Sequence, residues 1–108
     1  MNNTNNDIIY VKAMLHLKTS EESGKSNPIR TGYRPNHVFE QTNDLKKLKA
    51  YIGEIQFSDQ EFIHPGETKS VLVKFLRFGE IEKYISIGQK WFIYEVPRLV
   101  GEAEIIEI

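Results

Sequence analysis

The chain has 108 residues, no cysteine and nearly balanced charge, with 14 Lys and Arg against 15 Asp and Glu and a formal net charge of −1. The lack of cysteine excludes disulfides, thiolate nucleophiles and cysteine–zinc sites, and the balanced charge argues against strong non-specific binding of nucleic acid. The length fits one domain. Because no stretch has the composition of a signal peptide or the ~18 consecutive apolar residues of a membrane span, we expect a cytoplasmic protein without a membrane partner.

The first half of the chain predicts one long strand followed by a long loop. Residues 1–7 form a polar lead-in that we expect to be disordered, and a single domain is expected over residues 8–108. Apolar and polar side chains alternate over residues 9–17, which is the pattern of a strand with one buried face. Residues 18–36 are rich in Ser, Asn, Gly and Pro and indicate a long exposed loop, and a short strand is expected at residues 38–42.

A short helical turn is expected at residues 43–50. Asn43 can cap this turn, and Leu45 and Leu48 are spaced to share one face, which leaves lysines on the outside. An outer face of lysines is most often simply solvated.

The second half of the chain predicts strands separated by turns. The expected strands cover residues 51–57, 68–78, 81–87, 91–96 and 100–108, with the weakest pattern at 81–87. Six or seven short strands with turn residues between them and almost no helix indicate an all-β fold. A closed barrel or a sandwich would protect the sheet edges, and periodicity alone does not choose between the two.

The sequence lacks the motifs of a catalytic or cofactor site. It contains no phosphate-binding glycine loop, no GxSxG nucleophile motif and no HExxH metal motif. His16, His37 and His64 are scattered, and the glutamates of the last expected strand alternate with apolar residues as a solvated strand face does. We therefore expect no enzymatic activity, no metal and no cofactor, since an enzyme using carboxylates at a barrel mouth would need a pocket with converging polar groups.

Three stretches of the chain resemble, in order, the C-terminal barrel of bacterial translation elongation factor Tu. Residues 21–25, which are acidic and then basic, lead to Gly-Tyr-Arg-Pro-Asn at 32–36, and this is similar to the family's loop and its GYRPQ sequence. Residues 62–67 end in Pro-Gly-Glu, which resembles the family's PGD turn before a long valine-rich strand. Residues 88–95 and 98–101 resemble the family's GLRFAIRE and RTVG, so the similarity covers nearly the whole chain.

The resemblance implies a six-stranded antiparallel Greek-key barrel with a helical insertion near residues 43–50. It also implies no GTP binding or hydrolysis, because nothing in the sequence resembles the family's GTPase domain or middle barrel. In the family, this barrel helps to dock the T-stem of aminoacyl-tRNA and contacts the exchange factor. The matching RNA-contact positions are Lys25, Asn36 and Arg77, although turn residues such as Tyr33 are explained equally well by backbone geometry alone.

Several departures from the family alter the expected RNA face. Lys25 keeps the charge of a family arginine but lacks its planar fork, and Ser26 stands where the family has a histidine. Val96 stands where the family has a glycine, so the backbone would approach RNA less easily. The insertion at 43–50 displaces a threonine of the family's RNA face.

Two functions fit the sequence. The first is a non-enzymatic module that binds tRNA or structured RNA through a set of cationic and amide side chains: Lys25, Arg30, Arg34, Asn36, Arg77 and Arg98, with Lys46, Lys47 and Lys49 as further candidates. The second is a protein–protein module that binds a translation-associated partner, or serves as a decoy or immunity-type protein against a toxin that docks on elongation factor Tu. The nearly neutral charge favours the second function, because RNA binding rests on cations that contact phosphates.

Overall fold

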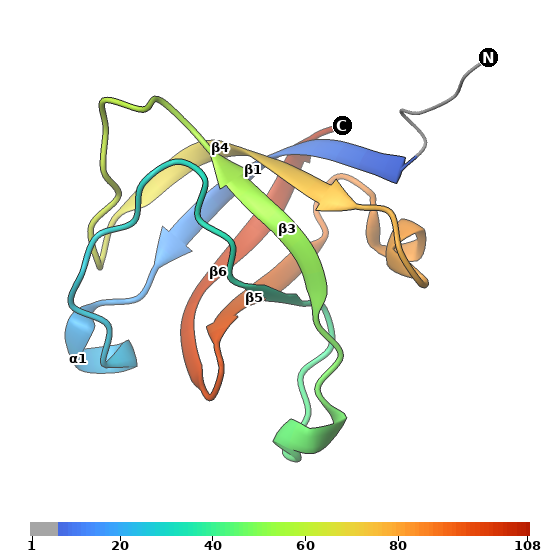
Figure 1. The fold of residues 1–108 in the computed structure, drawn as a ribbon, viewed down its shortest axis with the longest axis horizontal. Coiled ribbons are helices and arrows are strands. Elements are labelled where there is room, and N and C mark those ends of the chain that lie inside the picture. The colour runs from blue at the N-terminus through green and yellow to red at the C-terminus, as the bar shows by residue number, and fades with distance from the viewer. Residues whose placement is uncertain (1–6) are drawn as a thin grey trace.

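The alternating sequence pattern produces six strands that close into an antiparallel barrel (Figure 1). The structure is a computed structural model that describes residues 7–108. The strands are β1 (Ile8–Leu17), β2 (Asn36–Val38), β3 (Tyr51–Gln56), β4 (Thr68–Leu76), β5 (Lys90–Glu95) and β6 (Arg98–Glu107). Between them lie α1 (Ser20–Ser23) and two 3-10 turns, η2 (Leu45–Lys47) and η3 (Ile81–Tyr84). The expected all-β barrel is confirmed.

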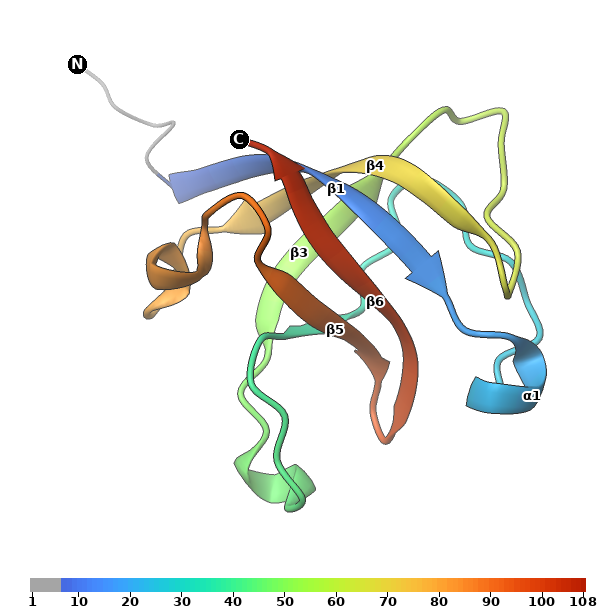
Figure 2. The same ribbon diagram turned by 180° about the vertical axis from the view of Figure 1, so that it is seen from behind.

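The strand order around the barrel is β1-β4-β3-β2-β5-β6, and β6 pairs with β1 to close the sheet (Figure 2). Strands β2, β3 and β4 pair with one another in succession, and β1 lies beside β4, which is the Greek-key arrangement. Because the sheet closes, each of these six strands has a neighbouring strand on both sides, and none of them is an edge strand.

Strand β1 shows how the sequence pattern sets the inner face of the barrel. Val11, Ala13, Leu15 and Leu17 point inward and are buried, whereas the residues between them are exposed or half-buried. A slip of one residue would turn this whole row to solvent, because side chains alternate with period two along a strand. Burial of the row therefore fixes the register of β1 with β4 and β6.

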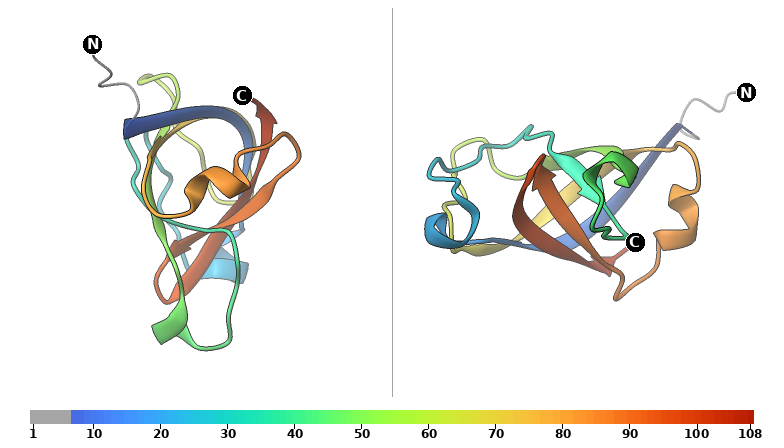
Figure 3. Two further views of the ribbon diagram at one scale, coloured as in Figure 1. Left: turned by 90° about the vertical axis from the view of Figure 1, so that its right-hand side faces the viewer. Right: turned by 90° about the horizontal axis from the view of Figure 1, so that it is seen from below.

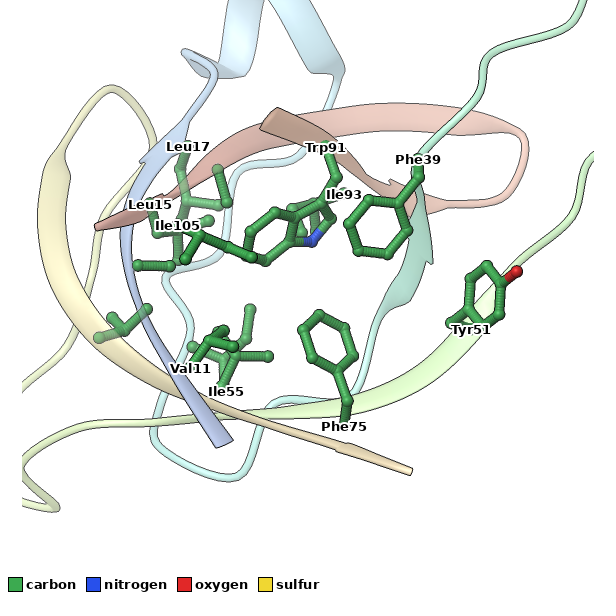
Figure 4. Packing of buried hydrophobic residues seen from close by; sticks show 14 of the residues in the cluster. Val11, Leu15, Leu17, Phe39, Tyr51, Ile55, Phe75, Trp91, Ile93 and Ile105 are labelled. Atoms are coloured by element: carbon green, nitrogen blue, oxygen red, sulfur yellow. The ribbon is translucent and has the colours of Figure 1, made fainter. Parts of the chain in front are cut away.

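The barrel interior is filled by a cluster centred on Trp91 and Phe75 (Figure 4), whose rings meet edge-on with centroids 5.5 Å apart. His37 is buried among them. Trp91 Nε1 donates to His37 Nδ1 at 3.0 Å, and His37 Nε2 lies 3.0 Å from the Gly53 carbonyl oxygen. Both bonds are satisfied by the neutral ring with its proton on Nε2. Burial lowers the pKa of His37 to about 4.

Gly53 lets β3 pass close to this cluster. A Cβ at this position would lie 2.9 Å from His37 Nε2 and 2.9 Å from Phe75 Cδ1. A glycine inside a strand often marks a site where other groups approach the backbone closely, and here it leaves room for the buried imidazole.

The loops gather at two opposite ends of the barrel. The end that we call the α1 end carries residues 18–35, 57–67 and the β5–β6 turn at 96–97, and the end that we call the aromatic end carries residues 39–50 and 77–89. At the aromatic end, η3 lies across the barrel opening (Figure 3, left). Ile81 in η3 is fully buried, so this turn closes the core at that end.

The strand prediction for residues 81–87 is wrong. The segment begins with the 3-10 turn η3, in which Lys83 N donates to the Glu80 carbonyl at 3.2 Å. Its apolar residues are not arranged for a sheet face, because Ile81 inserts into the barrel opening and Ile87 remains exposed. Apolar content without a paired neighbour does not make a strand.

The strand expected at 38–42 is wrong except at Val38. Strand β2 covers Asn36–Val38, because only there does the chain pair with β3 and β5. The helical turn expected at 43–50 is confirmed in the shorter form of η2. The loop expected to be exposed at 18–36 includes the helix α1 and the buried Ile29. Ile29 forms an isolated antiparallel β-bridge with Ile63.

The lead-in expected at 1–7 lies outside the described residues, except for Asp7. The Asp7 carbonyl accepts a hydrogen bond from Arg77 N at 2.7 Å, which extends the contact between the β1 and β4 segments. Within residues 7–108, no helix is both long and apolar enough to cross a membrane.

Candidate functional site

The predicted binding residues do not form one surface. Lys25, Arg30 and Arg34 lie in the β1–β2 loop at the α1 end, and Asn36 and Arg98 begin the strands β2 and β6 at the same end. Arg77 follows β4 at the aromatic end, on the opposite side of the barrel. The lysines of η2 also lie in the loops of the aromatic end. The sequence did not reveal this separation, because it depends on the direction of each strand in the closed sheet.

Lys25 and Arg98 converge on the carboxylate of Glu95 at the end of β5. Lys25 Nζ lies 3.0 Å from Glu95 Oε2, and Arg98 Nη2 lies 3.4 Å from Glu95 Oε1. The Tyr33 hydroxyl donates to Glu95 Oε2 at 2.5 Å, and Arg98 Nη1 donates to the Gly24 carbonyl at 2.7 Å. The arrangement is a charge network that ties the β1–β2 loop to the β5–β6 hairpin.

The pKa shifts in this network follow from its hydrogen bonds. Partial burial acts to raise the pKa of Glu95, but the hydrogen bonds from Tyr33 and Lys25 outweigh it and hold the pKa below its usual value. Burial, together with the bond to the Glu95 carboxylate, raises the pKa of Tyr33. Glu95 is therefore ionised and Tyr33 protonated near neutral pH, so the Tyr33 hydroxyl can donate its hydrogen bond to the Glu95 carboxylate.

The short helix α1 positions Gly24 and Lys25 for this network. The Thr19 side chain accepts from Glu22 N at 3.2 Å, while the Glu22 carboxylate accepts from Thr19 N at 2.9 Å, which is a capping box. Gly24 then ends the helix in the left-handed conformation with φ 80°. The spacing of Thr19 and Glu22 was the sequence signal that could have predicted α1.

Arg34, Arg77 and Arg30 are also engaged. Arg34 Nη2 lies 3.2 Å from Glu54 Oε2, and Arg77 forms an ion pair with Glu82. The Arg30 guanidinium lies 5.4 Å from the centroid of the Phe62 ring, which places a cation over an aromatic face. Among residues 7–108, Arg30 is the one cation of the α1 end predicted for binding whose charge is not matched by a carboxylate within salt-bridge distance, and the further candidates Lys46, Lys47 and Lys49 at the aromatic end are not matched either.

An apolar row on the outer wall of the barrel was missed by the sequence analysis. Ile8 pairs with Leu76 in the register of β1 and β4, and Ile52 on β3 precedes the Gly53–Phe75 pair. Ile52 is 64% exposed and Leu76 is 41% exposed. The sequence signal was an aliphatic residue at positions that the alternation assigns to the solvent side of each strand.

This row forms the floor of a groove of about 260 Å³, which we call the outer-wall groove. Its floor is made by Ile8, Ile52 and Leu76, and its rim carries Arg34, Glu54 and Lys74. Asn36 pairs with Ile52 in the register of β2 and β3, so it adjoins the groove. Two of the predicted residues, Arg34 and Asn36, are therefore brought together beside an apolar surface.

The histidines are not arranged as a metal site. His37 is enclosed in the core, whereas His16 Nδ1 lies 2.9 Å from Thr68 Oγ1 on the outer wall, and His64 Nδ1 lies 3.3 Å from Glu67 Oε1. Within the described chain, no three His, Cys, Asp or Glu side chains lie close enough to hold an ion.

No protein-family model matches the chain.

Proposed function

We propose that this domain is a non-enzymatic protein-binding module that uses the outer-wall groove. The proposal is carried by the combination of an exposed aliphatic floor with a polar rim. Exposed Ile52 and Leu76 lie side by side where the strand pattern normally places polar residues. An extended segment of a partner protein would bury these side chains, and apolar burial is the main favourable term in protein association.

The rim charges indicate the chemistry of the partner segment. Arg34 and Lys74 carry two positive charges beside the single negative charge of Glu54, so the rim has a surplus of one positive charge. A partner that places an aliphatic side chain on the floor and a carboxylate beside it would match both features. The resemblance to the elongation factor Tu barrel suggests a translation-associated protein as that partner.

The pairing of the predicted cations favours protein over RNA as the ligand. To bind phosphates, Lys25, Arg98, Arg34 and Arg77 would have to break their ion pairs with carboxylates. Replacing a carboxylate by a phosphate would contribute little net binding free energy at each position. The affinity of a protein for nucleic acid grows with the number of phosphates that it neutralises. With these four charges already matched inside the described chain, Arg30, Lys46, Lys47 and Lys49 remain for that purpose, and Arg30 lies at the opposite end of the barrel from the three lysines.

Site-specific photo-crosslinking in the native host tests the proposal. A photoreactive amino acid at Ile52 in the groove should yield a discrete protein adduct, and the adduct should disappear when Leu76→Asp places a charge on the groove floor. The matched control is the same photoreactive group at Glu102, an exposed residue on β6. Circular dichroism should verify that Leu76→Asp is folded.

Two outcomes would count against the proposal. Equal adducts from Ile52 and Glu102, or an adduct that persists in folded Leu76→Asp, would show that the groove is not the contact surface. Saturable binding of tRNA to the purified domain at both low and moderate salt, without a protein adduct, would favour the RNA-binding function instead.

A further inference from the structure

A cavity of about 190 Å³ lies at the aromatic end, between the β2–β3 loop and η3. Three aromatic rings form part of its wall. Phe39 and Tyr84 stack with centroids 4.5 Å apart, and Tyr51 meets Phe39 edge-on at 5.8 Å. The cavity shares no lining residue with the outer-wall groove. Its volume is below that of pockets for drug-sized ligands and suits a small ion or a small functional group.

Tyr51 has an unsatisfied hydrogen-bonding group at this place. The residue lines the cavity and is 5% exposed, and its buried hydroxyl has no hydrogen-bond partner within residues 7–108. Figure 4 shows its ring at the edge of the core cluster, with the hydroxyl turned away from Phe75. Buried polar side-chain atoms nearly always have a partner, so an exception beside a cavity indicates a ligand that supplies one.

The charges at the cavity favour an anionic ligand. Lys47 and Lys49 line the cavity, and neither forms a salt bridge with the described part of the chain. The hydrogen bond from Lys83 lowers the pKa of Glu80, with a smaller contribution from Lys49. The Glu40 carboxylate also lines the cavity, but it accepts a hydrogen bond from the Tyr84 hydroxyl and lies 4.0 Å from Lys83 Nζ. Together, the three lysines (Lys47, Lys49 and Lys83) and the two glutamates (Glu40 and Glu80) have a net charge of plus one.

Hydrogen bonds from backbone to side chain shape the turn η2, which carries Lys47. Asp44 N donates to Thr42 Oγ1 at 3.2 Å, and Lys46 N donates to Asp44 Oδ1 at 3.0 Å, which caps the turn. Lys46 and Lys47 are both exposed, but Lys47 lines the cavity and Lys46 does not. Lys46 is therefore a matched control for charge in the same turn.

We propose that this cavity binds a small oxyanion, the carboxylate or phosphate group of a small molecule, with Lys47 and Lys49 as its charge partners and the Tyr51 hydroxyl as a hydrogen-bond donor. Charge-assisted hydrogen bonds of this kind are stronger than those between neutral groups. The site is independent of the outer-wall groove, so the two proposals succeed or fail separately.

The test is an NMR titration of isotope-labelled protein with inorganic phosphate and, in a parallel series, with acetate. Ionic strength is held constant with sodium chloride, so that general screening by salt does not change. We expect saturable shifts of the resonances of cavity-lining residues with at least one of the two anions. The anion that saturates identifies whether the site prefers phosphate or carboxylate.

Three variants locate the binding. Tyr51→Phe and the double variant Lys47→Gln with Lys49→Gln should each lower the affinity of the protein for the anion about tenfold. Lys46→Gln should leave this affinity unchanged. Tyr51→Phe removes a hydroxyl that makes no bond in the free protein, so its fold should persist and its binding can be measured. The proposal is overturned if neither anion saturates, or if Tyr51→Phe and the double variant bind as tightly as the unaltered protein.

Discussion

Two tyrosines, the half-buried Tyr33 at the α1 end and the buried Tyr51 at the aromatic end, differ in whether their hydroxyl has a hydrogen-bond partner. The Tyr33 hydroxyl at the α1 end donates to Glu95 at 2.5 Å, and Glu95 is in turn held by Lys25 and Arg98. The Tyr51 hydroxyl at the aromatic end has no partner in the described chain, although lysines lie nearby. The network at the α1 end thus satisfies the Tyr33 hydroxyl and Glu95 internally, whereas the aromatic end leaves the Tyr51 hydroxyl unsatisfied beside a cavity within the described residues.

This contrast shows that the presence of cations does not by itself identify a binding surface. Lys25 and Arg98 were both predicted as binding residues, yet both link the β1–β2 loop to the β5–β6 hairpin inside the protein. Lys47 and Lys49 lie in the insertion expected relative to that family, and neither forms a salt bridge within the described residues. What separates the two pairs is the presence of a carboxylate in reach, which depends on the fold.

The largest expected effect concerns His37, which lies in the core between the two ends. Its pKa is lowered to about 4 in the folded chain, against 6.5 for an unperturbed histidine. Between these values the unfolded state binds more protons, so the free energy of unfolding should decrease as pH falls from 6.5 towards 4, by about 3 kcal/mol in total. Above pH 6.5 this contribution should be constant.

Urea unfolding at a series of pH values measures this dependence, and NMR titration of the His37 ring assigns it. A His37 resonance that titrates near pH 6.5 would contradict the expectation, because it would mean that protonation does not disrupt the bond from Trp91 Nε1.

A slightly smaller effect is expected for Glu95→Gln, which breaks the network of the α1 end. The variant leaves Lys25, whose side chain is 13% exposed, without its counter-charge, and we expect a loss of about 2 kcal/mol in the free energy of unfolding. Urea unfolding measures it, with Glu102→Gln on the outer wall as the control. A loss no greater than that of Glu102→Gln would show that the network contributes little stability. If released cations can bind RNA, Glu95→Gln should also bind tRNA more tightly than the unaltered protein at low salt.

Tyr33→Phe tests the same network by removing one hydrogen bond and no charge. We expect a loss of about 1 kcal/mol, since the Glu95 carboxylate loses one donor but keeps Lys25 and Arg98. The measurement is chemical denaturation at neutral pH. A neutral result would mean that solvent replaces the phenol without penalty.

Tyr51→Phe is the counterpart at the aromatic end, and it should have the smallest effect on stability. Its hydroxyl makes no bond in the free chain, so the free energy of unfolding should be unchanged or raised by up to about 1 kcal/mol. Denaturation alongside Tyr33→Phe compares the two ends directly. A clear loss of stability in Tyr51→Phe would reveal a partner for this hydroxyl and remove the contrast between the ends.

Most of the fold could be predicted from the sequence because strand periodicity is local. The alternation over residues 9–17 predicted a strand with one buried face, and Val11 and Leu15 of β1 do lie in the core. The apolar runs at 68–78 and 91–96 predicted the strands β4 and β5. The errors arose where a residue is apolar because of a tertiary contact and not because it belongs to a strand. Residues 81–87 carry apolar side chains because Ile81 closes the barrel opening, and this role has no periodic signature.

The candidate sites were less predictable than the fold. Arg34 and Asn36 were predicted as binding residues, and they do adjoin the outer-wall groove, but Ile52 and Leu76 on its floor were read only as parts of strands. The cavity at the aromatic end combines residues from 39–51 with Tyr84 of η3, which is distant from them in sequence. Neither juxtaposition has a local signal.

The sequence by itself determined the all-β class, the positions of most strands and the inward rows of apolar side chains, because these follow from a period of two along the chain. Only the tertiary structure decided which charges are matched and which are not. Glu95 meets Lys25 across 70 positions of sequence, since the β1–β2 loop and the end of β5 lie at the same end of a closed barrel. Electrostatic pairing depends on distance in space, and that distance is fixed only when the strands have closed.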